Sequence, residues 1–142
     1  MKRIILATFM CLACLFLGNS CNKEDYADDY VGIYNVGLVQ NVTWGNSSGT
    51  VTDSGVMRIT KESRNRVKLE GFISTEGVVT GNSIQLESTT STDSYGTVST
   101  VYGPGLLTGD ILTLSATSTG RLKNNGIFYP FSSADRFTCV KQ

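Results

Sequence analysis

Residues 78–86 read Val-Val-Thr-Gly-Asn-Ser-Ile-Gln-Leu, and this stretch decides the fold. An apolar pair is followed by Thr-Gly-Asn and then by alternating polar and apolar residues. Residues 106–114, Leu-Leu-Thr-Gly-Asp-Ile-Leu-Thr-Leu, repeat the pattern 28 residues later. Glycine beside Asn or Asp permits the positive φ angles of a tight hairpin turn. Each copy is therefore predicted to be a β-hairpin, and the two copies predict an antiparallel meander.

The same two-residue alternation runs through the neighbouring sequence, whereas helical periodicity is nearly absent. In residues 66–70, Arg-Val-Lys-Leu-Glu, the apolar side chains fall on one face and the charged ones on the other. Turn residues separate such stretches, and Pro130 allows a break in the last one. We expect about eight strands, over residues 31–44, 55–61, 65–73, 77–80 with 84–88, 95–102, 105–108, 110–117 and 126–141.

A sheet with one apolar face has to cover that face. Since no helix is expected, the sheet either closes on itself or doubles into a β-sandwich. We favour an all-β meander that closes into a small barrel, and the β-sandwich is the alternative. A barrel of this size fills its interior with side chains or holds one small ligand. Six inward-facing residues of the meander suit either interior: Ile59, Leu69, Ile84, Leu86, Leu112 and Leu114.

The first twenty residues are typical of an export signal. Lys2 and Arg3 precede an uncharged, mostly apolar run over residues 4–17, which is shorter than the roughly 20 residues of a membrane-spanning helix. Residues 18–21, Gly-Asn-Ser-Cys, resemble the lipobox of bacterial lipoproteins, and Cys14 is the rival site. The resemblance implies a signal peptide over residues 1–20 and lipidation of Cys21.

The residues after Cys21 resemble the surface-export signal of Bacteroidetes-type lipoproteins. Lys23, Glu24 and Asp25 carry the resemblance, which implies an outer-membrane protein that faces the cell exterior. Acidic residues outnumber Lys up to Asp29, so the segment 21–29 is predicted to be a solvated tether that does not pack. Residues 30–142 then form a single all-β domain.

The start of that domain is similar to a second family. Gly32-Ile33-Tyr34 resembles the Gly-x-Trp opening of lipocalins and other calycins, with Tyr in place of Trp. The resemblance implies a lipocalin-like barrel in which Arg136, on the last strand, crosses Tyr34 at the closed end. Gly32, Tyr34 and Arg136 would then be structural residues of barrel closure and would not bind a ligand.

Composition and motifs argue against several functions. Twelve Lys and Arg residues balance twelve Asp and Glu residues, so nothing points to a nucleic-acid partner. The absence of His removes His-dependent triads and His-containing metal sites. Cys139 has no partner once the other cysteines are assigned to the leader and the lipid, and it is predicted to be buried. No motif indicates catalysis, a cofactor or a metal, so we expect a protein that is not an enzyme.

The remaining candidates for binding are aromatic. Trp44 is predicted to open a polar loop over residues 45–55, and Tyr95 and Tyr102 flank a strand. Amphipathic rings at such edges supply contact area for ligands. The alternative for Trp44, which is slightly favoured, is that it plugs the end of the barrel. The sequence therefore favours a lipid-anchored envelope protein that binds a small molecule or a glycan without catalysis. The alternative is an interaction module, an accessory subunit or inhibitor that docks on another envelope protein by its loops or a sheet edge.

Overall fold

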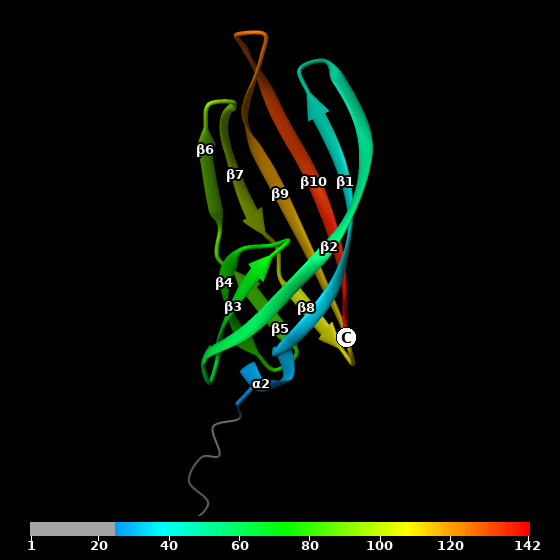
Figure 1. Cartoon of the computed structure of the whole chain (residues 1–142), viewed down its shortest axis with the longest axis vertical. Coiled ribbons are helices and arrows are strands. Elements are labelled where there is room, and N and C mark those ends of the chain that lie inside the picture. Colours follow the sequence, from blue (N-terminus) through cyan, green and yellow to red (C-terminus); the bar gives the residue numbers. More distant parts are fainter. Residues whose placement is uncertain (1–24) are drawn as a thin grey trace, which may run out of the picture.

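A computed structural model describes residues 25–142 of the protein. These residues form a ten-stranded antiparallel sheet and a short helix, α2 (Ala27–Tyr30) (Figure 1). The prediction of an all-β domain is confirmed. The strands are β1 (Gly32–Trp44), β2 (Ser47–Ser63), β3 (Arg66–Gly71), β4 (Thr75–Thr80), β5 (Ser83–Leu86), β6 (Thr89–Asp93), β7 (Gly96–Tyr102), β8 (Gly105–Thr108), β9 (Ile111–Asn124) and β10 (Ile127–Lys141).

Eight of the strands form a ring in the order β1-β2-β3-β4-β5-β8-β9-β10, because β10 pairs with both β9 and β1. The ring is barrel-like but is not closed evenly. β9 and β10 pair along their whole lengths, whereas β5 and β8 pair only at Ser83 and Ile84. Gly105 lies at that narrow junction, where a Cβ atom would clash with the side chains of Leu114 and Ile84. The predicted closure of a meander into a barrel is confirmed in this uneven form.

The long strands divide the molecule into a closed half and an open half. The closed half is the ring next to α2. In the open half the far ends of β1, β2, β9 and β10 continue beyond the ring, and β7 and β6 add to the same sheet (Figure 1). This is possible because β9 pairs with β8 at residues 111–113 and with β7 at residues 116–122. Among the described strands, none pairs with the outer edges of β6 and of residues 47–55 of β2.

The strand boundaries correct three predictions. Residues 45–55 are not a loop, because a two-residue turn at Gly45 and Asn46 leads directly into β2. β6 was not expected, and β10 runs through Pro130 without a break. The new strands are rich in Ser, Thr and Gly and bury few apolar side chains. Their pairing with long neighbouring strands overrides the weak local signal.

The two predicted hairpins are present as β4–β5 and β8–β9. Each has a two-residue turn that begins with glycine in the left-handed region, Gly81 with φ 58° and Gly109 with φ 59°. These positive φ angles are the ones that the Thr-Gly-Asn and Thr-Gly-Asp repeats predict for a tight hairpin turn.

The interior of the closed half is a hydrophobic core. The six inward-facing residues predicted from the meander pack in one cluster with Tyr34, Met57 and Phe137. Cys139 lies in the same cluster, so its predicted burial is confirmed. Burial raises the pKa of the Cys139 thiol to about 11 and keeps it protonated at neutral pH.

Helix α2 covers the end of this core. Ala27 and Tyr30 are fully buried, and the Tyr34 hydroxyl donates to the Tyr30 carbonyl at 2.8 Å. Lys61 Nζ lies 2.5 Å from Asp25 Oδ2 and 2.9 Å from Asp28 Oδ1. The prediction of an unpacked tether is therefore wrong for residues 25–29, because Ala27 is buried in the core and two ion pairs with Lys61 join the segment to the ring. Cys21, Lys23 and Glu24 lie outside the described residues, as does the predicted signal peptide.

The closure predicted from the calycin resemblance is also wrong in one residue. Tyr34 is buried as expected, and Gly32 packs against the Lys141 side chain. Arg136, however, is exposed on the outer face, where it pairs in register with Val39. Because its two neighbours in the chain face inward, Arg136 faces outward and does not cross Tyr34. The closed end is covered by α2 instead.

The buried phenols make stability sensitive to alkaline pH. Burial, with smaller contributions from nearby charges, raises the pKa of Tyr30 to about 12 and that of Tyr34 to about 12. An unfolded chain releases these protons near pH 10, so stability is complete below pH 10 and falls as pH rises toward 12. We expect a loss on the order of 2 kcal/mol per phenol, measured by urea unfolding at pH 8 and at pH 11.5.

Tyr30→Phe should reduce this alkaline loss by about the share of one phenol. An alkaline loss in Tyr30→Phe equal to that of the wild type would contradict the assignment.

Candidate functional site

The inner face of the open half is the continuation of the core-facing side of the ring. Alternation along each strand decides which side chains lie on it. The cross-strand register aligns these residues in rows, since Gln40 is opposite Asp135, and Asp135 is opposite Ala116. Residues on this face include Gln40, Val42 and Trp44 of β1, Phe131, Ser133 and Asp135 of β10, Ala116, Ser118 and Gly120 of β9, and Val98, Thr100 and Tyr102 of β7.

The rows next to the hydrophobic core are polar. The hydroxyls of Thr100 and Ser118 are 2.8 Å apart, and Ser118 Oγ donates to Asp135 Oδ2 at 3.5 Å. Gln40 Nε2 donates to Ser133 Oγ at 3.3 Å. These five side chains come from four neighbouring strands, and we call them the polar base.

Asp135 is the most unusual member of the polar base. Only 6% of the residue is exposed, and its Oδ1 atom is buried without a hydrogen-bond partner among the described residues. Its other oxygen accepts a single long bond from Ser118. A buried carboxylate is costly to desolvate unless donors compensate it. The Asp135 Oδ1 atom can therefore still accept a hydrogen bond. It lies next to the row of hydroxyls formed by Thr100, Ser118 and Ser133.

Tyr102 lies half-buried beside the polar base. Its ring shares the inner face with Ala116, the residue opposite it on β9. Burial raises the pKa of Tyr102, the charge of Asp135 raises it further, and a hydrogen bond with Thr89 opposes both. Tyr102 therefore remains a neutral phenol at physiological pH, available as a donor or an acceptor.

Aromatic rings lie on the same face near the tip of the open half. Trp44 and Tyr129 pack edge to face with ring centroids 6.2 Å apart and planes at 86°. Phe131 is opposite Trp44 in the β1–β10 register. Trp44 is 39% exposed, so it is not a plug of the closed core. The inner face thus combines a polar base with an aromatic tip.

The structure places two of the three predicted ligand-binding residues on the same face. Trp44 and Tyr102 lie on one face, at different levels of it. Tyr95 does not join them, because it sits in the β6–β7 turn with 68% of its surface exposed and its carbonyl bonded to the Lys123 amide. Asp135 was not singled out by the sequence. Alternation along the last strand could have identified it, because Asp135 falls on the same face as the apolar residues Phe137 and Cys139.

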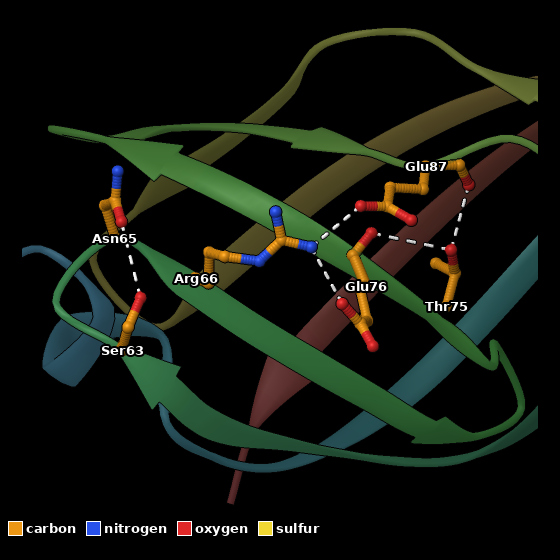
Figure 2. Close-up of polar contacts among 6 residues, drawn as sticks. All are labelled: Ser63, Asn65, Arg66, Thr75, Glu76 and Glu87. Carbon is orange, nitrogen blue, oxygen red and sulfur yellow. Dashed lines mark hydrogen bonds and ion pairs between the residues drawn. The ribbon is translucent and has the colours of Figure 1, made fainter.

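A second polar cluster lies on the outer face of the closed half. Figure 2 shows Arg66 of β3 between Glu76 and Glu87, with Nη2 at 2.8 Å from each carboxylate. Thr75 donates to the Glu87 carbonyl at 2.9 Å, which joins β4 to the segment after β5. These ion pairs are solvent-exposed, so they contribute little stability individually. They link neighbouring strands and form no buried site.

Within residues 25–142 no three His, Cys, Asp or Glu side chains gather as metal ligands would. No described helix has the length and apolar character needed to cross a membrane. Comparison with known proteins finds no family model that matches the chain, no match among curated proteins and no match among solved structures.

The half-exposed position of Trp44 predicts a small structural role. Trp44→Ala should lower the free energy of unfolding by about 1 kcal/mol, well below the roughly 3–5 kcal/mol of a buried aromatic deletion. Tyr34→Ala, which removes a fully buried ring, is the matched comparison and should show the larger loss in urea unfolding. Equal losses in the two variants would place Trp44 in the core and contradict the exposed tip.

Proposed function

We propose that the inner face of the open half binds a small molecule or a glycan without catalysing a reaction. The observation that carries the proposal is the unpartnered oxygen of buried Asp135 beneath a row of hydroxyls. Such a group costs stability in the free protein. A ligand with hydrogen-bond donors would compensate that cost.

The chemistry of the face favours a sugar among small ligands. Hydroxyl and amide groups of Gln40, Thr100, Ser118 and Ser133 match the alternating donors and acceptors of a sugar ring. Trp44 and Tyr129 offer large amphipathic surfaces for the apolar face of the ring. The hydrogen-bond partner of Asp135 among the described residues is the Ser118 hydroxyl, and the residues opposite it are Gln40 and Ala116. None of these is a second carboxylate or a nucleophile with its base, which supports binding without catalysis.

We propose that the protein is anchored to the outer membrane by lipid on Cys21 and faces the cell exterior. The position of α2 supports this arrangement, because the chain joins the ring at the closed end (Figure 1). The ion pairs of Lys61 with Asp25 and Asp28 hold that junction in place. An anchor four residues before Asp25 would lie close to the closed end, and the inner face would open away from the membrane.

We propose in addition that the domain is lipocalin-like. The eight-stranded ring and the buried Tyr34 of the first strand support it. The open half and the cap formed by α2 are departures from the closure that the resemblance implied. The proposed binding position lies on an open face rather than inside the ring, so the lipocalin resemblance does not support it.

A protein-interaction module is the second candidate. Three apolar side chains at the tips of the open half support it: Tyr95, Ile127 and Phe128 are each more than half exposed. Such side chains contribute to protein interfaces when they are clustered. In this alternative the tips of the hairpins, rather than the inner face, would make the contact.

Tryptophan fluorescence tests the binding proposal, because Trp44 is the single Trp of the chain. Oligosaccharides and apolar small molecules are titrated into the full chain in detergent, and a ligand on the inner face should shift Trp44 emission to the blue. Asp135→Asn should weaken that response, and Arg136→Gln, on the outer face of the same strand, should leave it unchanged. Silence toward all ligands, or equal responses in both variants, would favour the interaction module.

Cys21→Ala tests the anchor. The thiol is the proposed attachment atom, so the variant should remain uncleaved or become soluble when cells are fractionated. A variant that partitions into the outer membrane like the native chain would overturn the proposed lipidation.

A further inference from the structure

The strands of the open half separate charge between their two faces. On β9 and β10, Arg121, Lys123 and Arg136 alternate onto the outer face and are exposed. On the inner face the same alternation places Asp135, and on β2 it places Asp53 opposite Leu38. Among the described residues on that face there is no Lys or Arg. The face is therefore acidic although the whole chain has no net charge.

Within residues 25–142, no Lys or Arg side chain forms an ion pair with Asp135. All five ion pairs of the described residues lie elsewhere, on Lys61, Arg66 and Lys68. Charged hydrogen bonds stabilise more than neutral ones, and an uncompensated buried charge is costly. The missing partner is thus a cationic donor, and the alternation of β10 directs the Asp135 side chain to the inner face.

We propose that the ligand of the inner face is an oligosaccharide with a protonated amine, that is, an amino sugar, whose ammonium group pairs with Asp135. This inference rests on the proposed function and names its ligand class. The hydroxyls of Ser118 and Thr100 bind the neighbouring sugar hydroxyls. The acidic face rejects carboxylated and phosphorylated ligands, because like charges brought together without a counterion repel.

The size of the ligand follows from the register. Asp135 is opposite Gln40, and Trp44 is four residues farther along β1. At about 3.3 Å per residue the two positions are roughly 13 Å apart along the strand. A ligand that touches both is longer than one hexose ring, so an oligomer binds more tightly than a monomer. The Trp44 and Tyr129 rings then receive the sugar at the far end, and a cation near them gains a further attraction.

Three trisaccharides of similar size test the inference on the full chain in detergent. They are the glucosamine trimer, which carries protonated amines, its N-acetylated form, which is neutral, and the galacturonic acid trimer, which is anionic. Trp44 fluorescence and calorimetry measure their affinities at low and moderate salt. We expect the glucosamine trimer to bind about tenfold to a hundredfold more tightly than the neutral trimer, with the anionic trimer weakest.

Two variants test whether Asp135 causes the preference for the amine-bearing trimer. Asp135→Asn keeps the size of the side chain and should abolish the preference for the amine, while Arg136→Gln on the outer face should preserve it. The comparison of the three trimers needs no variant, so it decides the inference even if Asp135→Asn does not fold.

The outcomes separate this inference from the proposed function. Equal affinity for the amine and neutral trimers overturns the amino-sugar inference and leaves glycan binding intact. A preference for the anionic trimer, or an amine preference that survives in Asp135→Asn, also overturns it. Binding only of apolar molecules overturns it and moves the site to another ligand class, and no binding of any probe removes both proposals.

Discussion

The register of β1, β9 and β10 is the constraint on which the rest of the structure depends. These strands run without interruption from the closed half into the open half, so their alternation is set once, by the core. Burial of Phe137 and Cys139 in the ring requires that Asp135 and Ser133 also face inward. A slip of one residue would expose the core and bring Arg136 to the inner face. The hydrophobic effect in one half thereby determines the charge of the other.

The closed end adds a second constraint, because a ring alone leaves its core open to water. Ala27 and Tyr30 cover that end, and the Tyr34 hydroxyl bonds to the Tyr30 carbonyl from inside. The cap belongs to the segment that precedes the first strand, so the N-terminal approach and the core are stabilised together. The opposite end has no such cover among the described residues. The proposed binding face lies at this uncovered end, away from α2.

Sequence reasoning predicted the parts of the fold in which apolar residues alternate or glycine selects a turn. Both hairpins of the repeat and the buried meander residues follow directly from those signals. β6 and the first part of β2 were missed because Thr, Ser and Gly side chains give no periodic apolar signal, and their strands form by pairing with longer neighbours. Asp135 was overlooked and Arg136 misplaced for one reason. Phe137 faces inward, so alternation along β10 turns Arg136 outward and Asp135 inward. The calycin resemblance, by contrast, implied an inward Arg136.

The open half contributes less to the stability of the fold than the closed half. Its strands are held by backbone pairing and hydroxyl contacts such as Thr90 with Ser99, and its inner face buries few large side chains. It also retains a carboxylate with an unpartnered oxygen, whereas apolar residues of similar size would pack against Phe137 at lower cost. A sequence selected for stability alone would cover this face or shorten the strands. Long strands, exposed aromatic rings and buried Asp135 occur together on this face, and they are the features on which the proposed ligand would act. Such a ligand would stabilise the folded state by mass action.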